Sequence, residues 1–193
     1  MTRVLAALAA GDEEGAAEVA LRDHGPAVLR YLQSLLRDPD DADDAFSLFA
    51  EQVWKRIGTF RGQGGFEVWL FRIAFREALR FQDSSWKRKR RALPTTEASR
   101  IAADVRRTAS ISRDRRLEAL ERLRASLSLE DQHLLVLRVD HGLSFKDIAA
   151  TLGDSEGLEE VTVRKRFERA KARLARLAKD EGLLPGGPGQ TRR

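Results

Sequence analysis

The sequence of 193 residues contains no cysteine and only three histidines. Without cysteine the chain has no disulfide, no thiolate zinc site and no thiol nucleophile. The histidines are His24, His133 and His141, and no two of them are spaced to share one face of a helix. We therefore expect no metal, no cofactor and no enzymatic activity.

A long hydrophobic segment is also missing. No apolar run approaches the roughly 20 residues that a membrane-spanning helix requires. The N-terminal apolar patch, residues 4–10, is short and is followed directly by Gly11 and three acidic residues, a pattern more typical of a helix than of a signal peptide. The sequence predicts a cytoplasmic bacterial protein that does not insert into the membrane.

Strand patterns are absent, whereas apolar residues recur at helical spacing almost throughout. The predicted fold is all-α, with two small helical domains joined by a flexible basic linker. The expected boundaries are residues 1–91, a linker over 92–113 that has room for one helical stretch, a second domain over 114–182 and a disordered tail over 183–193. Within the first domain, helices are expected to break at Gly11, at Gly25-Pro26 and at Asp38-Pro39.

The excess of positive charge suggests a polyanionic partner. The formal net charge is +5 with a pI near 9.9, and five consecutive cations run from Lys87 to Arg91. Such a run can follow nucleic-acid phosphates, although it can equally be a solvated linker.

The segment from Leu143 to Leu177 has the pattern of a helix-turn-helix. Ser144 and Asp147 predict an N-cap for a short helix that ends at Gly153. The second helix has an apolar stripe, consisting of Val163, Phe167, Ala170, Leu174 and Leu177, and carries cations on the other side. This arrangement predicts insertion of the second helix into the major groove of DNA, the alternative being a surface helix of a bundle.

A helix predicted over residues 66–82 is rich in aromatic residues. Its aromatics at positions 66, 69, 71, 75 and 81 cannot all face one side, so some are expected at the surface beside arginines, where they could stack on unpaired bases. The preceding loop, residues 60–65, contains three glycines but lacks the Lys-Ser or Lys-Thr of a nucleotide-binding P-loop.

Seven segments together resemble the extracytoplasmic-function (ECF) sigma factors of bacterial RNA polymerase. In the first domain, residues 10–14, 22–32, 38–44 and 60–74 are similar to that family's region two. In the second domain, residues 127–138, 142–153 and 162–174 are similar to region four. The resemblance covers nearly all of residues 9–179.

The resemblance implies a dissociable subunit that directs core RNA polymerase to promoters. Region two would bind the clamp helices of the largest polymerase subunit and open the minus-ten element, and region four would lie near the flap and read the minus-thirty-five element. The implied polymerase contacts are Asp44, Ser47, Leu48 and Glu51. The implied strand-capture residues are Phe60, Arg61, Gly62, Trp69, Arg72, Arg76, Lys87 and Arg88. The implied minus-thirty-five readers are Thr162, Arg164, Lys165, Arg166 and Arg169.

Three positions depart from the family pattern. Ser47-Leu48 replaces the usual Gln-Glu, and Phe75-Arg76 stands where an asparagine commonly occurs. The turn before Thr162 is about four residues longer than usual, roughly one helical turn. We expect this addition to place Glu159 and Glu160 near DNA.

Two other classes of protein share parts of this pattern. A polymerase-independent helix-turn-helix regulator would use residues 114–181 alone and would not need the region-two-like aromatic loop. A metal-dependent nuclease using the Asp40 to Asp44 carboxylates is disfavoured because capping of a helix accounts for that cluster. The flexible linker would also allow an anti-sigma protein to hold the two domains closed.

Overall fold

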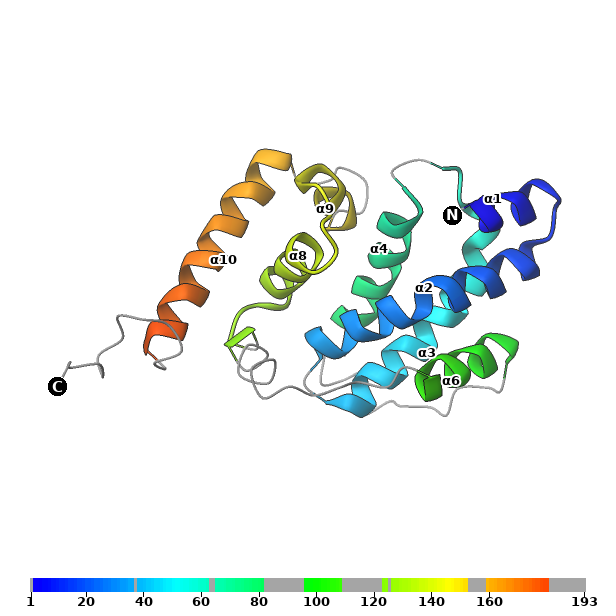
Figure 1. Cartoon of the computed structure of the whole chain (residues 1–193), viewed down its shortest axis with the longest axis horizontal. Helices are drawn as coiled ribbons and strands as arrows, with labels where there is room; N and C mark the ends of the chain where they lie inside the picture. Colours follow the sequence, from blue (N-terminus) through cyan, green and yellow to red (C-terminus); the bar gives the residue numbers. More distant parts are fainter. Residues whose placement is uncertain are drawn as a thin grey trace. The chain divides into compact units, whose positions relative to one another are not determined.

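The computed structural model describes residues 2–36, 38–62, 65–81, 96–108, 123–124, 126–152 and 159–180. These residues form helices, and no strand occurs among them (Figure 1). The chain divides between Ile111 and Ser112 into two compact units, here called unit 1 and unit 2. The all-α, two-domain fold predicted from the sequence is confirmed.

Unit 1 begins with α1 (Thr2–Ala9) and α2 (Glu13–Leu35). Gly11 turns the chain between them with a φ of +76°, in the left-handed region that glycine adopts most easily. The Asp12 carboxylate accepts a hydrogen bond from the Gly15 backbone N–H at 2.8 Å and so caps the start of α2.

Helix α2 runs without interruption through Gly25 and Pro26, so the predicted break at these residues is wrong. The reason is a continuous apolar stripe on both sides of the proline. Its buried members at helical spacing are Ala17, Leu21, Val28, Leu32 and Leu35. Burying this stripe along the whole helix outweighs the one backbone hydrogen bond that Pro26 cannot donate.

The chain continues through α3 (Pro39–Arg56), the short 3-10 helix η1 (Ile57–Thr59) and α4 (Phe66–Arg80). Asp38 caps α3 by accepting the backbone N–H of Asp40 at 2.9 Å. Helices α2, α3 and α4 pack against one another, and their contact surfaces bury Leu32, Phe46, Phe49, Val53, Phe66 and Leu70 among others.

Helix α4 buries more of its aromatic side chains than the sequence suggested. Phe66, Phe71, Phe75 and Phe81 are all 3% exposed or less, because neighbouring parts of unit 1 cover α4 on more than one side. The expectation that some of the five aromatic residues lie at the surface therefore holds for one of them and not for these four. Trp69 is the aromatic residue of α4 that stays partly exposed.

Helix α6 (Glu97–Thr108) lies in the segment that the sequence analysis assigned to the linker. Its buried residues Ala98, Ile101, Ala102 and Val105 follow the i, i+3, i+4, i+7 pattern of one helix face. This face packs against α2 and α3, so α6 belongs to unit 1 (Figure 1). One helical stretch was expected in this segment, but its packing onto unit 1 was not predicted, because half of the face is alanine and arginines surround it.

Unit 2 contains α8 (Leu129–Val139), α9 (Phe145–Leu152) and α10 (Glu160–Asp180). Ser128 caps α8 by accepting the Asp131 N–H at 3.2 Å. Ser144 accepts the Asp147 N–H at 3.1 Å, which confirms the predicted N-cap of α9. Leu127, Leu135 and Ala170 form a core cluster, and the partly buried Phe167 and Leu174 pack against it.

The described residues were also compared with the requirements of a membrane-spanning helix and of a metal site. None of their helices is both long and apolar enough to cross a lipid bilayer. No three acidic or histidine side chains among them are placed together in a way that could hold a metal ion.

Candidate nucleic-acid interface

Helix α10 has one buried and one cationic side. Val163 and Ala170 are buried, while Thr162, Arg164, Lys165 and Arg169 are exposed. The two sides arise from residue spacing, because positions 163, 167 and 170 repeat at three and four residues and share one face. Four of the five predicted minus-thirty-five readers therefore lie on solvent-exposed positions of one helix.

Arg164 is held by contacts on two sides. Its NH2 donates to Oε1 of Glu160 at 2.8 Å, and its guanidinium lies 5.3 Å from the centre of the Phe145 ring. The Arg138 guanidinium lies 4.7 Å from the centre of the same ring. A guanidinium held this close to an aromatic ring gains a cation–π attraction, so Phe145 and Glu160 limit the positions that Arg164 adopts.

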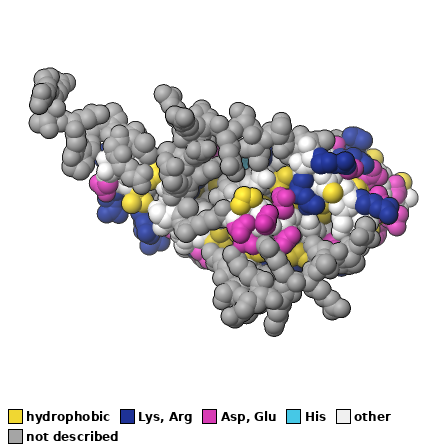
Figure 2. Space-filling view, turned by 90° about the horizontal axis from the view of Figure 1, so that it is seen from below, with side chains coloured by type: hydrophobic (Ala, Val, Ile, Leu, Met, Phe, Trp, Pro, Cys, Tyr) yellow, Lys and Arg dark blue, Asp and Glu magenta, His cyan; other side chains and the backbone are white. Residues whose placement is uncertain are grey.

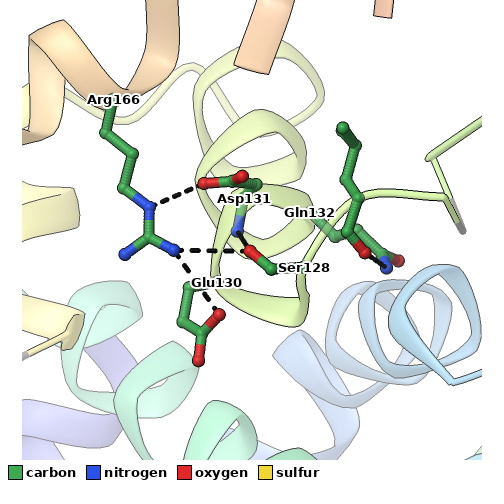
Figure 3. Close-up of polar contacts among 6 residues, drawn as sticks. Ser128, Glu130, Asp131, Gln132 and Arg166 are labelled. Atoms are coloured by element: carbon green, nitrogen blue, oxygen red, sulfur yellow. Dashed lines mark hydrogen bonds and ion pairs between the residues drawn. The ribbon is translucent and has the colours of Figure 1, made fainter. Parts of the chain in front are cut away.

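Arg166 differs from the other predicted readers because its side chain contacts α8. Figure 3 shows the guanidinium facing Ser128, Glu130 and Asp131 at the start of α8. Its Nε donates to Asp131 Oδ1 at 2.6 Å, and its NH2 lies 3.4 Å from Ser128 Oγ and 3.5 Å from Glu130 Oε2. The Arg166 side chain is 29% exposed. The structure therefore places Arg166 at the junction of α8 and α10.

A buried histidine lies next to this junction. The His133 ring is 2.6 Å from Thr151 Oγ1, which joins α8 to α9. Burial, and to a smaller extent the positive charge of the nearby Arg166, together lower the pKa of His133 to about 3. His133 is therefore neutral at physiological pH and has a structural position. The residue pattern favours a capping or surface role for each histidine, and this expectation is wrong for His133, which is 0% exposed.

Six of the eight predicted strand-capture residues lie on α4 or in the segment just before it. Trp69, Arg72 and Arg76 occupy positions i, i+3 and i+7 of α4 and are all partly exposed, so they share one side of the helix. Lys87 and Arg88 lie outside the described residues, as does the part of the glycine-containing loop at positions 63–64.

Phe60 is mostly buried, which distinguishes it from an exposed base-stacking residue. Its ring lies 5.1 Å from that of Phe66 and 5.7 Å from that of Trp69. The next two residues are exposed: Arg61 donates to the Gly58 carbonyl at 2.6 Å, and Gly62 has a φ of +75°. Phe60 thus packs against the partly exposed Trp69.

The predicted polymerase-contact residues on α3 differ in accessibility. Asp44 and Leu48 are partly exposed, whereas Ser47 and Glu51 are each only 8% exposed. Acidic side chains gather on the side of the molecule where α3 and α6 lie, as Figure 2 shows. Burial raises the pKa of the Asp43 carboxyl in this region, and the nearby Arg106 acts in the opposite direction.

Arg106 was not predicted from the sequence. Its NH1 donates to Ser47 Oγ at 2.7 Å and to the Asp43 carbonyl at 3.3 Å. The only signal in the sequence was the faint apolar pattern of α6, which fixes the face on which Arg106 lies.

Comparisons with known proteins agree with a helix-turn-helix unit that follows an aromatic, arginine-rich unit. Residues 20–91 match the family Sigma-70 region 2, and residues 117–174 match Sigma-70, region 4. The chain belongs to the ECF RNA polymerase sigma factors, which direct the initiation of transcription. The family and function predicted from the sequence are confirmed.

Particular relatives cover most of the chain. It is 33% identical over 175 residues to the ECF RNA polymerase sigma factor SigM of Mycobacterium tuberculosis. This match covers 90% of this chain and 82% of SigM. It is 27% identical over 165 residues to the RNA polymerase sigma-H factor of Pseudomonas aeruginosa, covering 82% of this chain and 79% of that protein.

A solved structure is similar as well. The structure of CnrH in complex with the cytosolic domain of CnrY matches with a TM-score of 0.62 and 26% identity, covering 93% of this chain and 97% of that chain.

Proposed function

We propose that this sigma factor reads the minus-thirty-five element through one side of α10. The observation that supports this most directly is the exposure of Lys165 and Arg169 opposite the buried side of the helix, with Thr162 and Arg164 exposed on the two flanks. Lys165 and Arg169 have no ion-pair partner among the described residues, so both can contact phosphates. Thr162 and Arg164 lie within the first two turns of α10, the part of a recognition helix that reaches base edges.

Arg166 has a different role in this proposal. Its guanidinium is bound to α8, so its charge is partly compensated within the protein. We assign it to orienting α10, and we assign base and phosphate contacts to the other four residues. Phosphate contacts fix the register of the helix, and base contacts give the specificity.

Unit 1 is proposed to open the minus-ten element and to bind core RNA polymerase. Trp69 offers a ring that Phe60 and Phe66 support, with Arg72 and Arg76 along the same side of α4. A partly exposed aromatic next to guanidinium groups suits a strand whose bases are unstacked. Lys87 and Arg88 would extend this basic path, and Asp44 and Leu48 are the accessible polymerase contacts on α3.

The expected partners are core polymerase, through its clamp helices and flap, and promoter DNA. An anti-sigma protein is a further proposed partner, supported by the similarity to CnrH, whose structure was solved with the cytosolic domain of CnrY. The protein would act in the cytoplasm and would perform no covalent chemistry itself, because the polymerase supplies the active site.

Reconstituted transcription tests this proposal. Purified chain is added to core RNA polymerase with a pool of genomic promoter fragments, and transcripts are mapped at their 5′ ends. New start sites that require both the chain and core polymerase are expected. Binding to duplex DNA without association with core polymerase would instead identify a polymerase-independent regulator.

A matched pair of variants separates DNA reading from polymerase binding. Lys165→Ala and Arg169→Ala should each reduce the magnitude of the negative slope of log affinity against log salt by about 1. Core binding should change little. Lys179→Ala, at the far end of α10, is the control and should leave promoter use unchanged. Full promoter use by the double variant Lys165→Ala/Arg169→Ala would contradict the assignment.

A further inference from the structure

One side of α3 carries three polar residues at intervals of four. Asp43, Ser47 and Glu51 are offset by about 40° per step around the helix, so they form a single row. Two of the four residues assigned to polymerase binding, Ser47 and Glu51, belong to this row. Both are 8% exposed in unit 1. A partner cannot contact them while this face stays covered.

Helix α6 covers the Asp43 and Ser47 end of this row. Arg106 donates from NH1 to Ser47 Oγ at 2.7 Å and to the Asp43 carbonyl at 3.3 Å, and its Nε is 3.8 Å from Asp43 Oδ2. Arg106 therefore contacts a carboxylate, a carbonyl and a hydroxyl of α3, and the Ser47 hydroxyl in turn donates to the same Asp43 carbonyl at 3.0 Å. The Asp43 side chain is 47% exposed beside this contact.

The apolar side of α6 fits closely between α2 and α3. A Cβ added at Gly25 of α2 would lie 3.2 Å from Val105 Cγ2 and 3.3 Å from Cζ of Phe46 on α3. Ile101 and Val105 of α6 are 2% and 5% exposed. The absence of a side chain at Gly25 thus allows α6 to approach the α2–α3 surface.

We propose that α6 and core RNA polymerase compete for the same face of α3, so that the free protein occupies part of its own docking surface. This inference rests on the proposed polymerase contacts of α3. Asp44 and Leu48 are accessible and can make the first contact with polymerase. Completion of the interface then requires α6 to leave, which exposes Ser47 and lets the partner take over Asp43.

The polar groups of this row also indicate what kind of side chain the partner must supply when it replaces α6. The Asp43 carboxylate now has a guanidinium nearby, and Ser47 accepts from the same group. A polymerase segment that replaces Arg106 must therefore supply a cationic donor at this point. The neighbouring acidic residues at the start of α3 favour a basic partner for the same reason.

A disulfide that locks α6 in place tests the competition. The chain has no native cysteine, and the 3.2 Å between a Cβ at position 25 and Val105 Cγ2 is close to the spacing of a carbon and the opposite sulfur in a disulfide. The full-length double variant Gly25→Cys/Val105→Cys is measured against immobilised core polymerase, first oxidised and then reduced. We expect the oxidised form to bind at least about tenfold more weakly than the reduced form, because the competent state is no longer populated.

The controls are the two single-cysteine variants, which receive the same oxidation and reduction and should each bind core polymerase with the same affinity in both states. Circular dichroism checks that each variant is folded. Equal core affinity of the oxidised and reduced double variant would overturn the competition, since α6 would not need to move.

Arg106→Ala gives a second, independent measurement. Loss of its contacts with α3 should raise core affinity about five- to tenfold, because α6 is released more often. Lower affinity would mean that Arg106 is itself a polymerase contact and would also overturn the proposal. Failure of the wild-type chain to bind core polymerase would instead refute the proposed function, so the two failures are distinguishable.

Discussion

Arg166 of α10 donates through Nε to Oδ1 of Asp131 on α8 at 2.6 Å, and this pair joins α10 to the first turn of α8. The two residues are separated by 35 positions in the chain. Their side chains are 29% and 20% exposed, so water screens the pair only partly. The angle at which α10 leaves the core of unit 2 therefore depends on both residues.

The first prediction concerns this pair. Arg166→Ala and Asp131→Ala should each destabilise unit 2 by about 1–3 kcal/mol and weaken binding to promoter DNA to a similar extent. The double variant should be little worse than either single variant, because both remove one interaction. Urea unfolding followed by circular dichroism and promoter binding of holoenzyme measure the two effects.

The comparison between the two single variants separates the possible roles of Arg166. If Arg166 reads a base, Arg166→Ala should reduce promoter binding far more than Asp131→Ala does. That result would contradict an orienting role.

The second prediction concerns Glu160, which binds Arg164 at 2.8 Å. Glu160→Ala should release Arg164 and change promoter preference, while stability changes little because the pair is exposed on the surface. Glu160→Gln, which keeps the shape but not the charge, is the matched control. Selection from a randomised minus-thirty-five library measures the preference, and an unchanged preference would rule out this effect of the longer turn.

The third prediction is a pH dependence that originates at His133. Its pKa is about 3 in the folded protein and near 6.5 in the unfolded chain, so below pH 6.5 the unfolded state binds the extra proton. Stability should therefore be complete above pH 6.5 and fall by up to about 1.4 kcal/mol for each pH unit between 6.5 and 3. Urea unfolding by circular dichroism at a series of pH values measures this slope.

His133→Gln is the control for the pH series, because an amide can contact Thr151 but does not titrate. Its stability should depend less on pH than that of the wild type in this range. Identical slopes would show that other groups dominate the acid sensitivity.

The fourth prediction concerns Pro26 within α2. Pro26→Ala restores a backbone N–H inside the helix and should stabilise unit 1 by roughly 1–3 kcal/mol. Tryptophan fluorescence during urea unfolding reports on this unit selectively, since Trp54, Trp69 and Trp86 all precede the boundary at Ile111. A lower stability of Pro26→Ala would show that the packing of the proline ring matters more than the missing hydrogen bond.

The sequence predicted those features that depend on local spacing. The cap formed by Ser144 and Asp147 and the stripe through Val163 and Ala170 follow from residues close together in the chain. The membership in the sigma-factor family followed from motifs of the same kind.

Features that depend on distant contacts could not be predicted in the same way. The continuity of α2 through Pro26 reflects burial along its whole length, which propensity at one residue does not report. The attachment of Arg166 to α8 depends on the distance between two helices, and the periodicity of α10 contains no information about it. Helix α6 combines both difficulties, because its apolar face is small and its partners are on α2 and α3.

The position of Val105 against Gly25 also bears on how the protein is made. These residues are 80 positions apart in the sequence, 105 minus 25, so α2 leaves the ribosome well before the helix that covers it. A nascent chain that stops at residue 91 contains the whole region-two match and still lacks Ile101 and Val105. Until α6 is synthesised, the apolar surface between α2 and α3 remains exposed to chaperones and to self-association.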